Sequence, residues 1–136
     1  MLPLLLALSV LSASAQNTVR DCSSGKSLFT FISGSLLPSP VVPGENAILS
    51  LSAQIPAGTV VNAGTATYSL SFNGIPFSPT TEDLCSQVDC PLVAGPYTNS
   101  SASVFPTGIS GKLVTKIQWF DTKETLLLCT EVTSKI

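Results

Sequence analysis

The residues best suited to chemistry are two cysteines, Cys85 and Cys90, in the stretch DLCSQVDCPL. The chain of 136 residues holds four cysteines and no histidine. A structural zinc site would therefore need all four sulfurs, because such zinc takes four protein ligands. A redox pair would use the C-x-x-C spacing, which this loop lacks. We therefore expect a structural disulfide here, and we predict no metal and no cofactor.

The first residues of the chain explain why disulfides are expected. An apolar run from Leu4 to Leu11 precedes Ala13-Ser14-Ala15, the small-x-small pattern of a signal-peptidase site. The run is too short to span a bilayer, which takes about 20 apolar residues. We predict a signal peptide over residues 1–15 and a mature domain over 16–136; the alternative is a buried N-terminal strand or helix. Secretion implies an oxidising compartment, where an even number of cysteines normally forms disulfides.

The four cysteines allow three pairings. A local bridge between Cys85 and Cys90 is favoured, because so short a loop keeps the two thiols close together. The remaining bridge, Cys22–Cys129, would join the first segment of the mature domain to the last. Closing so long a loop should stabilise the fold by about 4–5 kcal/mol in the chain-entropy model.

Little else in the chain could catalyse a reaction. Without histidine, neither a serine triad nor a cysteine–histidine dyad can be built. Glu82, Asp83 and Asp89 flank the cysteine loop, and paired carboxylates run glycoside hydrolysis. Neighbouring residues in an extended chain point apart, however, so we expect these acids to be a solvated loop surface. The chain is therefore not expected to be an enzyme.

The charge of the chain excludes another class of function. Six basic and eight acidic residues give a net charge of −2. The six cations are scattered along the chain, whereas nucleic-acid binding needs a clustered basic surface. We therefore expect a secreted, soluble and monomeric protein with no nucleic-acid partner.

Alternating apolar and polar residues predict a domain built from β-strands. Between residues 66 and 72, apolar side chains alternate with hydroxyl side chains, which places one side of a strand in a core. Turn residues recur about every ten positions, which is typical of a β-sandwich. Asn73-Gly74 predicts a tight turn, and the proline-rich run 38–44 an inter-strand loop. Strands are predicted over 28–32, 47–55, 66–72, 97–104, 112–120 and 126–132, the last two forming a hairpin across the polar turn 121–124.

A true immunoglobulin domain would have its tryptophan a strand or so after the first cysteine. Here Trp119 lies ten residues before Cys129 and far from Cys22, so that interpretation is disfavoured. The apolar run from Phe72 to Pro79, which leads into the cysteine loop, either caps a filled core or lines an apolar cavity.

A series of short motifs in one order resembles the ML (MD-2-related lipid-recognition) family, and most closely its Niemann–Pick C2-like sterol and phospholipid carriers. The motifs are Asp21-Cys22-Ser23, Gly74-Ile75-Pro76-Phe77, Cys90-Pro91-Leu92, Gln118-Trp119 and Leu128-Cys129-Thr130-Glu131. The resemblance covers residues 16–136. It implies an all-β, immunoglobulin-like β-sandwich of two antiparallel sheets with seven to eight strands, an apolar cavity between them, and the same two disulfides.

The resemblance also implies where a lipid would bind. Phe77 and Phe105 match aromatic positions of the family's pocket and are expected to gate its mouth. The expected wall residues are Tyr68, Leu70, Val104, Ile117 and Trp119. The chain departs from the animal carriers in having no cysteine pair within residues 38–44. Asn99-Ser100-Ser101 is a glycosylation sequon, which we expect to be exposed.

The predicted function is therefore non-enzymatic binding and transfer of a sterol or phospholipid. We expect transient contact with a membrane or with a membrane lipid-transfer partner, outside the cell or in a lysosomal or vacuolar lumen. The first alternative is a lipid-sensing or receptor-binding recognition module without transfer activity. The second is a lipid-free structural sandwich.

Overall fold

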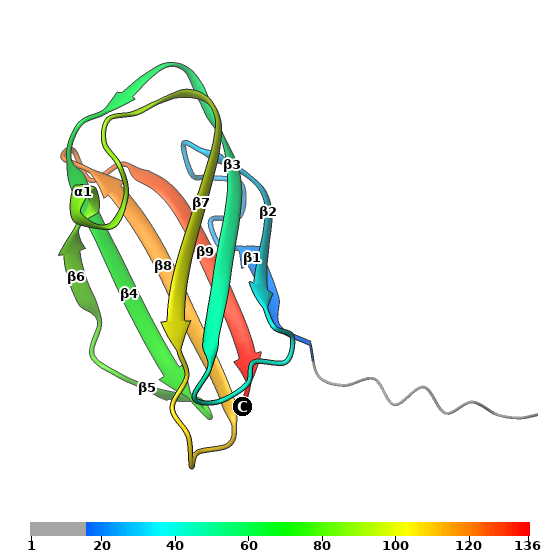
Figure 1. Ribbon diagram of the computed structural model, residues 1–136. Coiled ribbons are helices and arrows are strands. Elements are labelled where there is room, and N and C mark those ends of the chain that lie inside the picture. Colours follow the sequence, from blue (N-terminus) through cyan, green and yellow to red (C-terminus); the bar gives the residue numbers. More distant parts are fainter. Residues whose placement is uncertain (1–15) are drawn as a thin grey trace, which may run out of the picture.

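The computed structural model describes residues 16–136, so the predicted signal peptide lies outside the described residues. Two antiparallel β-sheets pack face to face, with one short helix at an edge (Figure 1). This confirms the predicted immunoglobulin-like sandwich, although residues 16–136 form nine strands instead of seven or eight.

The two sheets differ in size. The six-stranded sheet has the order β1-β9-β8-β4-β5, with β6 also paired to β4. Its strands are β1 (Thr18–Asp21), β4 (Gly64–Phe72), β5 (Ile75–Pro76), β6 (Thr80–Asp83), β8 (Lys112–Asp121) and β9 (Leu126–Lys135). The three-stranded sheet has the order β2-β3-β7, formed by β2 (Thr30–Leu37), β3 (Asn46–Val61) and β7 (Leu92–Val104). Helix α1 (Leu84–Gln87) follows β6.

Five of the predicted strands are confirmed, and most of them extend beyond the predicted bounds. The strand predicted over 28–32 instead begins at Thr30. The reason is that Leu28 and Phe29 donate backbone hydrogen bonds to the carbonyls of Leu126 and Leu127, in the other sheet. The chain crosses between the sheets only after Phe29.

Both predicted turns are also confirmed. Asn73 and Gly74 take positive φ angles of 50° and 80° between β4 and β5. In the β8–β9 hairpin, Asp121 Oδ1 accepts hydrogen bonds from the backbone N–H groups of Lys123 and Thr125, both at 2.9 Å. A side-chain acceptor of this kind replaces backbone bonds that a tight turn cannot make.

The core lies between the two inner faces. Alternation along each strand directs every second side chain inward. The buried side chains include Ala66, Ile117, Trp119 and Leu128 from the six-stranded sheet, and Leu51, Ala53, Ile55 and Leu92 from the other.

The structure forms both predicted disulfides. Cys22 bonds to Cys129, with their Cα atoms 5.0 Å apart, and ties the segment after β1 to β9. Cys85 bonds to Cys90 across 5.5 Å and fastens α1 to the loop that leads into β7. The second bridge therefore fixes the only helix in the described part of the chain, which lies at the edge of the sandwich.

Candidate functional site

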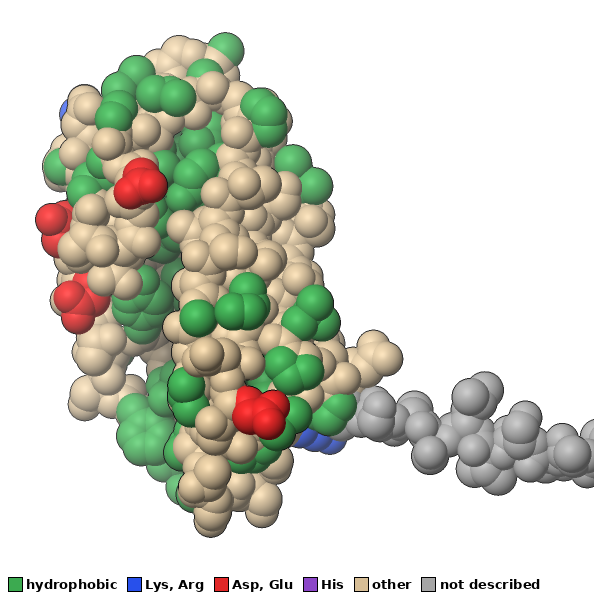
Figure 2. Space-filling model, in the orientation of Figure 1, with side chains coloured by type: hydrophobic (Ala, Val, Ile, Leu, Met, Phe, Trp, Pro, Cys, Tyr) green, Lys and Arg blue, Asp and Glu red, His purple; other side chains and the backbone are tan. Residues whose placement is uncertain are grey.

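A cavity of about 180 Å³ lies between the two sheets, beside α1. Figure 2 shows the hollow between the sheet edges, with hydrophobic side chains inside it. Its lining consists of Tyr68, Ile117 and Trp119 from the six-stranded sheet, Leu49, Leu51, Asn99 and Ser101 from the three-stranded sheet, and Gln87 and Val88 at α1.

The register of β4 against β8 positions the first wall. Tyr68 pairs with Ile117, and Ala66 pairs with Trp119, in an antiparallel ladder. Residues two apart on a strand share a face, so all four side chains point toward the other sheet. The small side chain of Ala66 leaves room beside the indole of Trp119, because directly opposed Cβ atoms lie only about 5 Å apart.

Aromatic contact joins the two walls. The rings of Tyr97 on β7 and Trp119 on β8 meet edge to face, with centroids 6.1 Å apart and an interplanar angle of 74°. Asn99 Nδ2 donates a hydrogen bond to Tyr97 Oη at 3.1 Å. Of the residues that line the cavity on β7, Asn99 is therefore held by a hydrogen bond to Tyr97.

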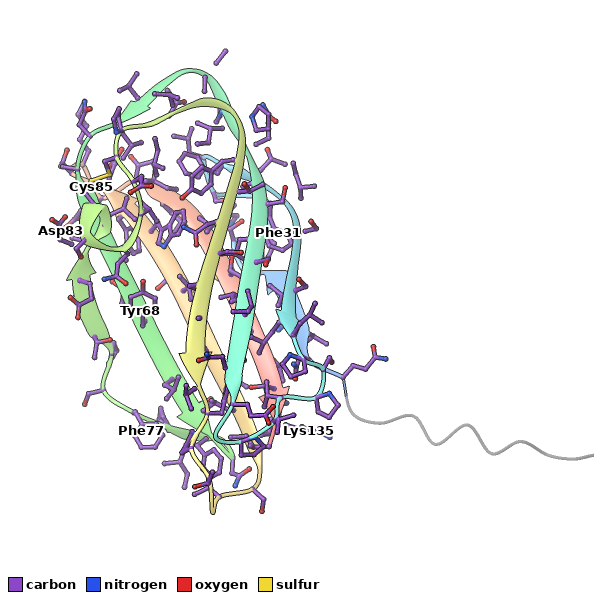
Figure 3. All side chains as sticks on the ribbon, viewed as in Figure 1. Phe31, Tyr68, Phe77, Asp83, Cys85 and Lys135 are labelled. Carbon is purple, nitrogen blue, oxygen red and sulfur yellow. A yellow bond between two sulfur atoms is a disulfide. The ribbon has the colours of Figure 1, made fainter. Side chains whose placement is uncertain are left out.

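A hydrogen bond links β4 to the helix at the cavity's edge. Tyr68 Oη donates to Gln87 Oε1 at 3.2 Å. Burial raises the pKa of Tyr68, and the negative charge of Glu82 raises it further, so the hydroxyl stays protonated and remains a donor. Figure 3 shows Tyr68 on β4 near the α1 turn that carries Cys85.

Two buried polar atoms on the inner face of the six-stranded sheet have no hydrogen-bond partner among the described residues. They are Trp119 Nε1, on a side chain that is 4% exposed, and Thr130 Oγ1, on a side chain that is 0% exposed. Buried polar groups in native proteins are nearly always hydrogen-bonded, so each exception needs an explanation.

The structure brings together three of the seven predicted lipid-binding residues. Tyr68, Ile117 and Trp119 line the cavity. Leu70 lies on the same face of β4 as Tyr68, one step further along the strand, and is 37% exposed. Phe105 is partly buried and packs against the core.

None of the other four predicted residues lines the cavity, and two of them, Phe77 and Val104, lie on outer faces of the sheets. Phe77 is 54% exposed and lines a separate hollow of about 390 Å³ with Ser69, Ser71 and Val114, which are on the outer face of the six-stranded sheet. Val104 is 59% exposed. It lies on the opposite face of β7 from Asn99 and Ser101, because alternate residues of a strand point to opposite sides.

Sequence analysis missed six of the lining residues. Leu49 and Leu51 lie in a predicted strand whose alternation could have indicated them. Gln87 and Val88 lie in the cysteine loop, which has no periodic signal. The other two, Asn99 and Ser101, are polar, whereas the sequence analysis expected only apolar and aromatic side chains around a lipid cavity. Asn99, expected to be exposed, lies partly buried against the cavity, and its glycosylation stays a prediction.

In Figure 2, acidic side chains lie above the hollow and along its left side. Glu82 and Asp83 are adjacent on β6, paired with Ala66 and Thr65, so they point to opposite faces as predicted. Asp89 lines an adjoining hollow that shares Gln87 and Asn99 with the cavity. Across residues 16–136, we find no cluster of side chains suited to hold a metal ion, and no helix long and apolar enough to cross a membrane.

Comparison with known families now identifies the fold. The sequence profile of the ML domain matches residues 16–136. The chain belongs to the ML domain family. This ML domain was therefore correctly recognised from its motifs, and comparison with curated proteins adds no match.

Solved structures share the fold at low sequence identity. A Niemann-Pick type C2 protein from the Japanese carpenter ant is 15% identical, with a TM-score of 0.64 over 88% of this ML domain chain and 98% of its own. Chicken MD-1, solved with lipid IVa, is 13% identical, with a TM-score of 0.59 over 88% of each chain. The alkylpurine DNA glycosylase AlkC of Pseudomonas fluorescens is 11% identical, with a TM-score of 0.51 over 81% of this chain and 31% of its own. Likeness at these identities shows the fold alone.

Proposed function

We propose that this ML domain binds a lipid between its two sheets and carries it between membranes without catalysing a reaction. The observation that carries the proposal is the inter-sheet cavity, with Tyr68, Ile117 and Trp119 as one wall. The lipid IVa bound to chicken MD-1 is consistent with this use of the fold.

The openness of the sandwich favours a carrier over a lipid-free structural domain. Ser101 and Ser103 lie on the inner face of β7, yet both are exposed. In a closed sandwich the inner positions of both sheets fill the core. Part of the gap between the sheets is therefore open to a guest molecule.

The size of the cavity limits how a lipid would bind. An apolar cavity of about 150 Å³ holds a molecule as small as benzene. The observed 180 Å³ therefore accepts only one end of a lipid, and the rest would extend through the opening. Each buried methylene contributes about 0.8 kcal/mol, so binding needs no catalytic or charged group.

The end of the sandwich that carries β5 provides a surface for membrane contact. Hydrophobic side chains gather at this lower end in Figure 2. Exposed large apolar residues in and beside its three connections are Leu37, Val42, Ile75, Phe77, Val104 and Ile109. We call this surface the β5 end. Contiguous exposed apolar surface typically marks a site of interaction with a protein or a membrane.

Phe105 directly follows β7 and packs partly buried against the core, so it is the proposed gate between membrane and cavity. Phe77, on the outer side of the six-stranded sheet, is proposed to contact the membrane beside that gate. Both disulfides fit an oxidising compartment, either extracellular or the lumen of a lysosome or vacuole. The carrier is proposed to act as a monomer.

Two neighbouring serines allow a matched test in protein produced without glycosylation, because Ser101 also completes the Asn99 sequon. Ser101 lines the cavity, whereas Ser100 faces the outer surface of the three-stranded sheet beside Ser50. Ser101→Phe should fill the cavity and weaken binding of a fluorescent sterol and a fluorescent phosphatidylcholine at least about tenfold, or roughly 1.4 kcal/mol. Ser100→Phe should leave both affinities unchanged. Equal affinities for the two variants, with β-sheet circular dichroism retained, would count against the proposal.

A further inference from the structure

We propose that the free edge of β7 binds an extended, basic segment of a partner protein, which pairs with β7 as a further strand of the three-stranded sheet. We call the backbone edge of residues 97–104 that faces away from β3 the β7 edge. Its use as a docking surface goes beyond the proposed lipid binding and does not depend on it, although the two sites are neighbours.

The β7 edge carries backbone groups without a partner strand. β7 is the last strand in the order β2-β3-β7, and within residues 16–136 it pairs with β3 alone. In an antiparallel pair, every second residue exchanges both backbone hydrogen bonds with its neighbour. The N–H and C=O groups of the remaining residues therefore point away from β3. Such a row of groups is a template for pairing with another chain.

The other edges of the sandwich are short or covered. β1, β5 and β6 have at most four residues each. On β2, Asn17 Nδ2 donates a hydrogen bond to the carbonyl of Leu36 at 3.0 Å, and a bulge interrupts the pairing between Phe31 and Ser33. Residues 97–104 contain no proline and no charged side chain, and their pairing with β3 has no bulge. Proteins commonly block an edge by one of these means, so the β7 edge is the one left open for pairing.

The hollow that adjoins the cavity lies along the β7 edge and has a volume of about 350 Å³. Four consecutive residues of β7, from Tyr97 to Ser100, line it together with residues 85–89. Neighbouring side chains of a strand point to opposite faces, so four consecutive residues line one hollow only at the backbone edge of the strand. The hollow therefore offers room for a paired chain between β7 and the α1 segment, on the side of β7 that faces α1 in Figure 1.

The side of this hollow opposite β7 is acidic. Asp89 lines it, and no basic residue does so in the described part of the chain. Glu82 pairs with Ala66, and directly opposed residues share a face, so Glu82 points to the same side as the buried Ala66, toward the three-stranded sheet. Its charge raises the pKa of Tyr68, which lines the cavity next to the hollow. A basic side chain on the inward side of a docked strand would therefore meet opposite charge, and an acidic one would be repelled.

The outward side of a docked strand would continue the outer face of the three-stranded sheet. On that face Thr98 and Ser100 are its nearest neighbours, and both are small and uncharged. Uncharged β-branched residues suit such positions in a sheet. The partner segment is therefore expected to alternate basic residues, facing inward, with residues such as valine or threonine, facing outward.

A synthetic peptide of alternating valine and lysine, about as long as residues 97–104, is the probe. The protein would be produced with both disulfides and without glycosylation, because Asn99 lines the hollow and a sugar there would compete with the peptide. The peptide should protect every second amide of residues 97–104 from hydrogen exchange, since these amides face away from β3 in the free protein. A peptide of alternating valine and glutamate should bind at least about tenfold more weakly. Binding without protection of these amides, or equal binding of both peptides, would overturn the proposal.

Two methylated peptides separate strand pairing from attraction between charges. Methylating the backbone nitrogens of all valines removes the N–H groups along one edge of the extended peptide, and methylating those of all lysines removes them along the other. One of the two peptides should bind at least about tenfold more weakly than the parent, because it loses the hydrogen bonds to β7. The other should bind within about twofold of the parent. Equal affinities of the two methylated peptides would show that the peptide does not pair as a strand.

Two protein variants with the same change in net charge test the acidic side. Glu82→Gln/Asp89→Asn should bind the lysine peptide about three- to tenfold more weakly, the range for two exposed ion pairs. Glu45→Gln/Glu131→Gln should bind it within about twofold, because neither of these acids lines the hollow. Equal losses in the two variants would overturn the assignment of this partner. Failure of the unchanged protein to bind the lysine peptide would overturn the docking site and leave the proposed lipid binding intact, since lipid affinity is measured without the peptide.

Discussion

Tyr97 and Trp119 come from different sheets and meet edge to face, with ring centroids 6.1 Å apart. Such a pair contributes about 0.5–1.5 kcal/mol beyond the burial of its area. Tyr97→Leu removes the ring, whereas Tyr97→Phe removes only the hydroxyl that accepts from Asn99. We expect the free energy of unfolding to fall about 1 kcal/mol further in Tyr97→Leu than in Tyr97→Phe. Urea unfolding followed by Trp119 fluorescence measures both, and equal losses would contradict a stabilising ring contact.

The two disulfides should contribute unequally to stability. Cys22–Cys129 closes a loop with a sequence separation of 107, and Cys85–Cys90 one of 5. In the chain-entropy model, replacing both cysteines by alanine should cost about 5 kcal/mol for the long loop and about 2 kcal/mol for the short one. Thermal and urea unfolding of the two double variants test this order. A larger loss for the Cys85–Cys90 variant would show that this bridge stabilises α1 by more than loop closure.

Tyr68 should make the fold less stable in alkaline solution. Burial, and then the charge of Glu82, raise the pKa of its hydroxyl in the folded protein. Above about pH 10 the unfolded chain loses this proton first, so the folded state binds more protons and stability falls as pH rises. The stabilisation is complete below the ordinary tyrosine pKa and is lost as pH rises through the folded value.

Urea unfolding at several pH values between about 9 and 11 tests this dependence. Tyr68→Phe should lose less stability over that range than the unchanged protein. Glu82→Gln should fall between the two, because it removes only the second cause of the shift. Identical slopes for the unchanged protein and Tyr68→Phe would exclude Tyr68 as the group responsible.

The sequence predicted one wall of the cavity and three strands of the six-stranded sheet, but not the short strands β1, β5 and β6 of this sheet. Its strands β4, β8 and β9 have a clear apolar inner face, so alternation alone identifies the face that holds Tyr68, Ile117 and Trp119. The polar turn at Asp121 predicts the β8–β9 hairpin and, with it, the register in which these two strands pair.

The other wall could not be predicted in the same way. On β7 the inner face carries Asn99 and Ser101, because these residues border an open cavity and not a filled core. Without an apolar alternation, the sequence did not show that Val104 points outward. Phe77 follows a strand of only two residues, β5, so no periodicity indicated which face of the sheet it lies beside. The site is least predictable where the sandwich departs from a closed core.

The apolar β5 end should control the rate of lipid transfer and not the strength of binding. Ile75 and Phe77 are exposed there and lie outside the cavity, so serine at both positions should leave the fold and the affinity intact. Burying one such side chain in an apolar environment contributes about 1.5–3 kcal/mol, and even partial insertion of two should favour membrane contact about tenfold. The Ile75→Ser/Phe77→Ser variant should therefore transfer a fluorescent sterol between phosphatidylcholine vesicles about tenfold more slowly.

The matched control uses Val60 and Val93, which are similarly exposed and pair between β3 and β7, away from the β5 end. The Val60→Ser/Val93→Ser variant loses comparable apolar surface, so it should transfer the sterol at the unchanged rate if membrane contact is made through the β5 end. Equal slowing of both variants would mean that contact is not specific to that end. If the unchanged protein binds the sterol but exchanges none between vesicles, the domain is a lipid-recognition module and not a carrier. In that case the apolar residues of the β5 end are better explained as a surface for a protein partner, because exposed apolar patches serve both kinds of contact.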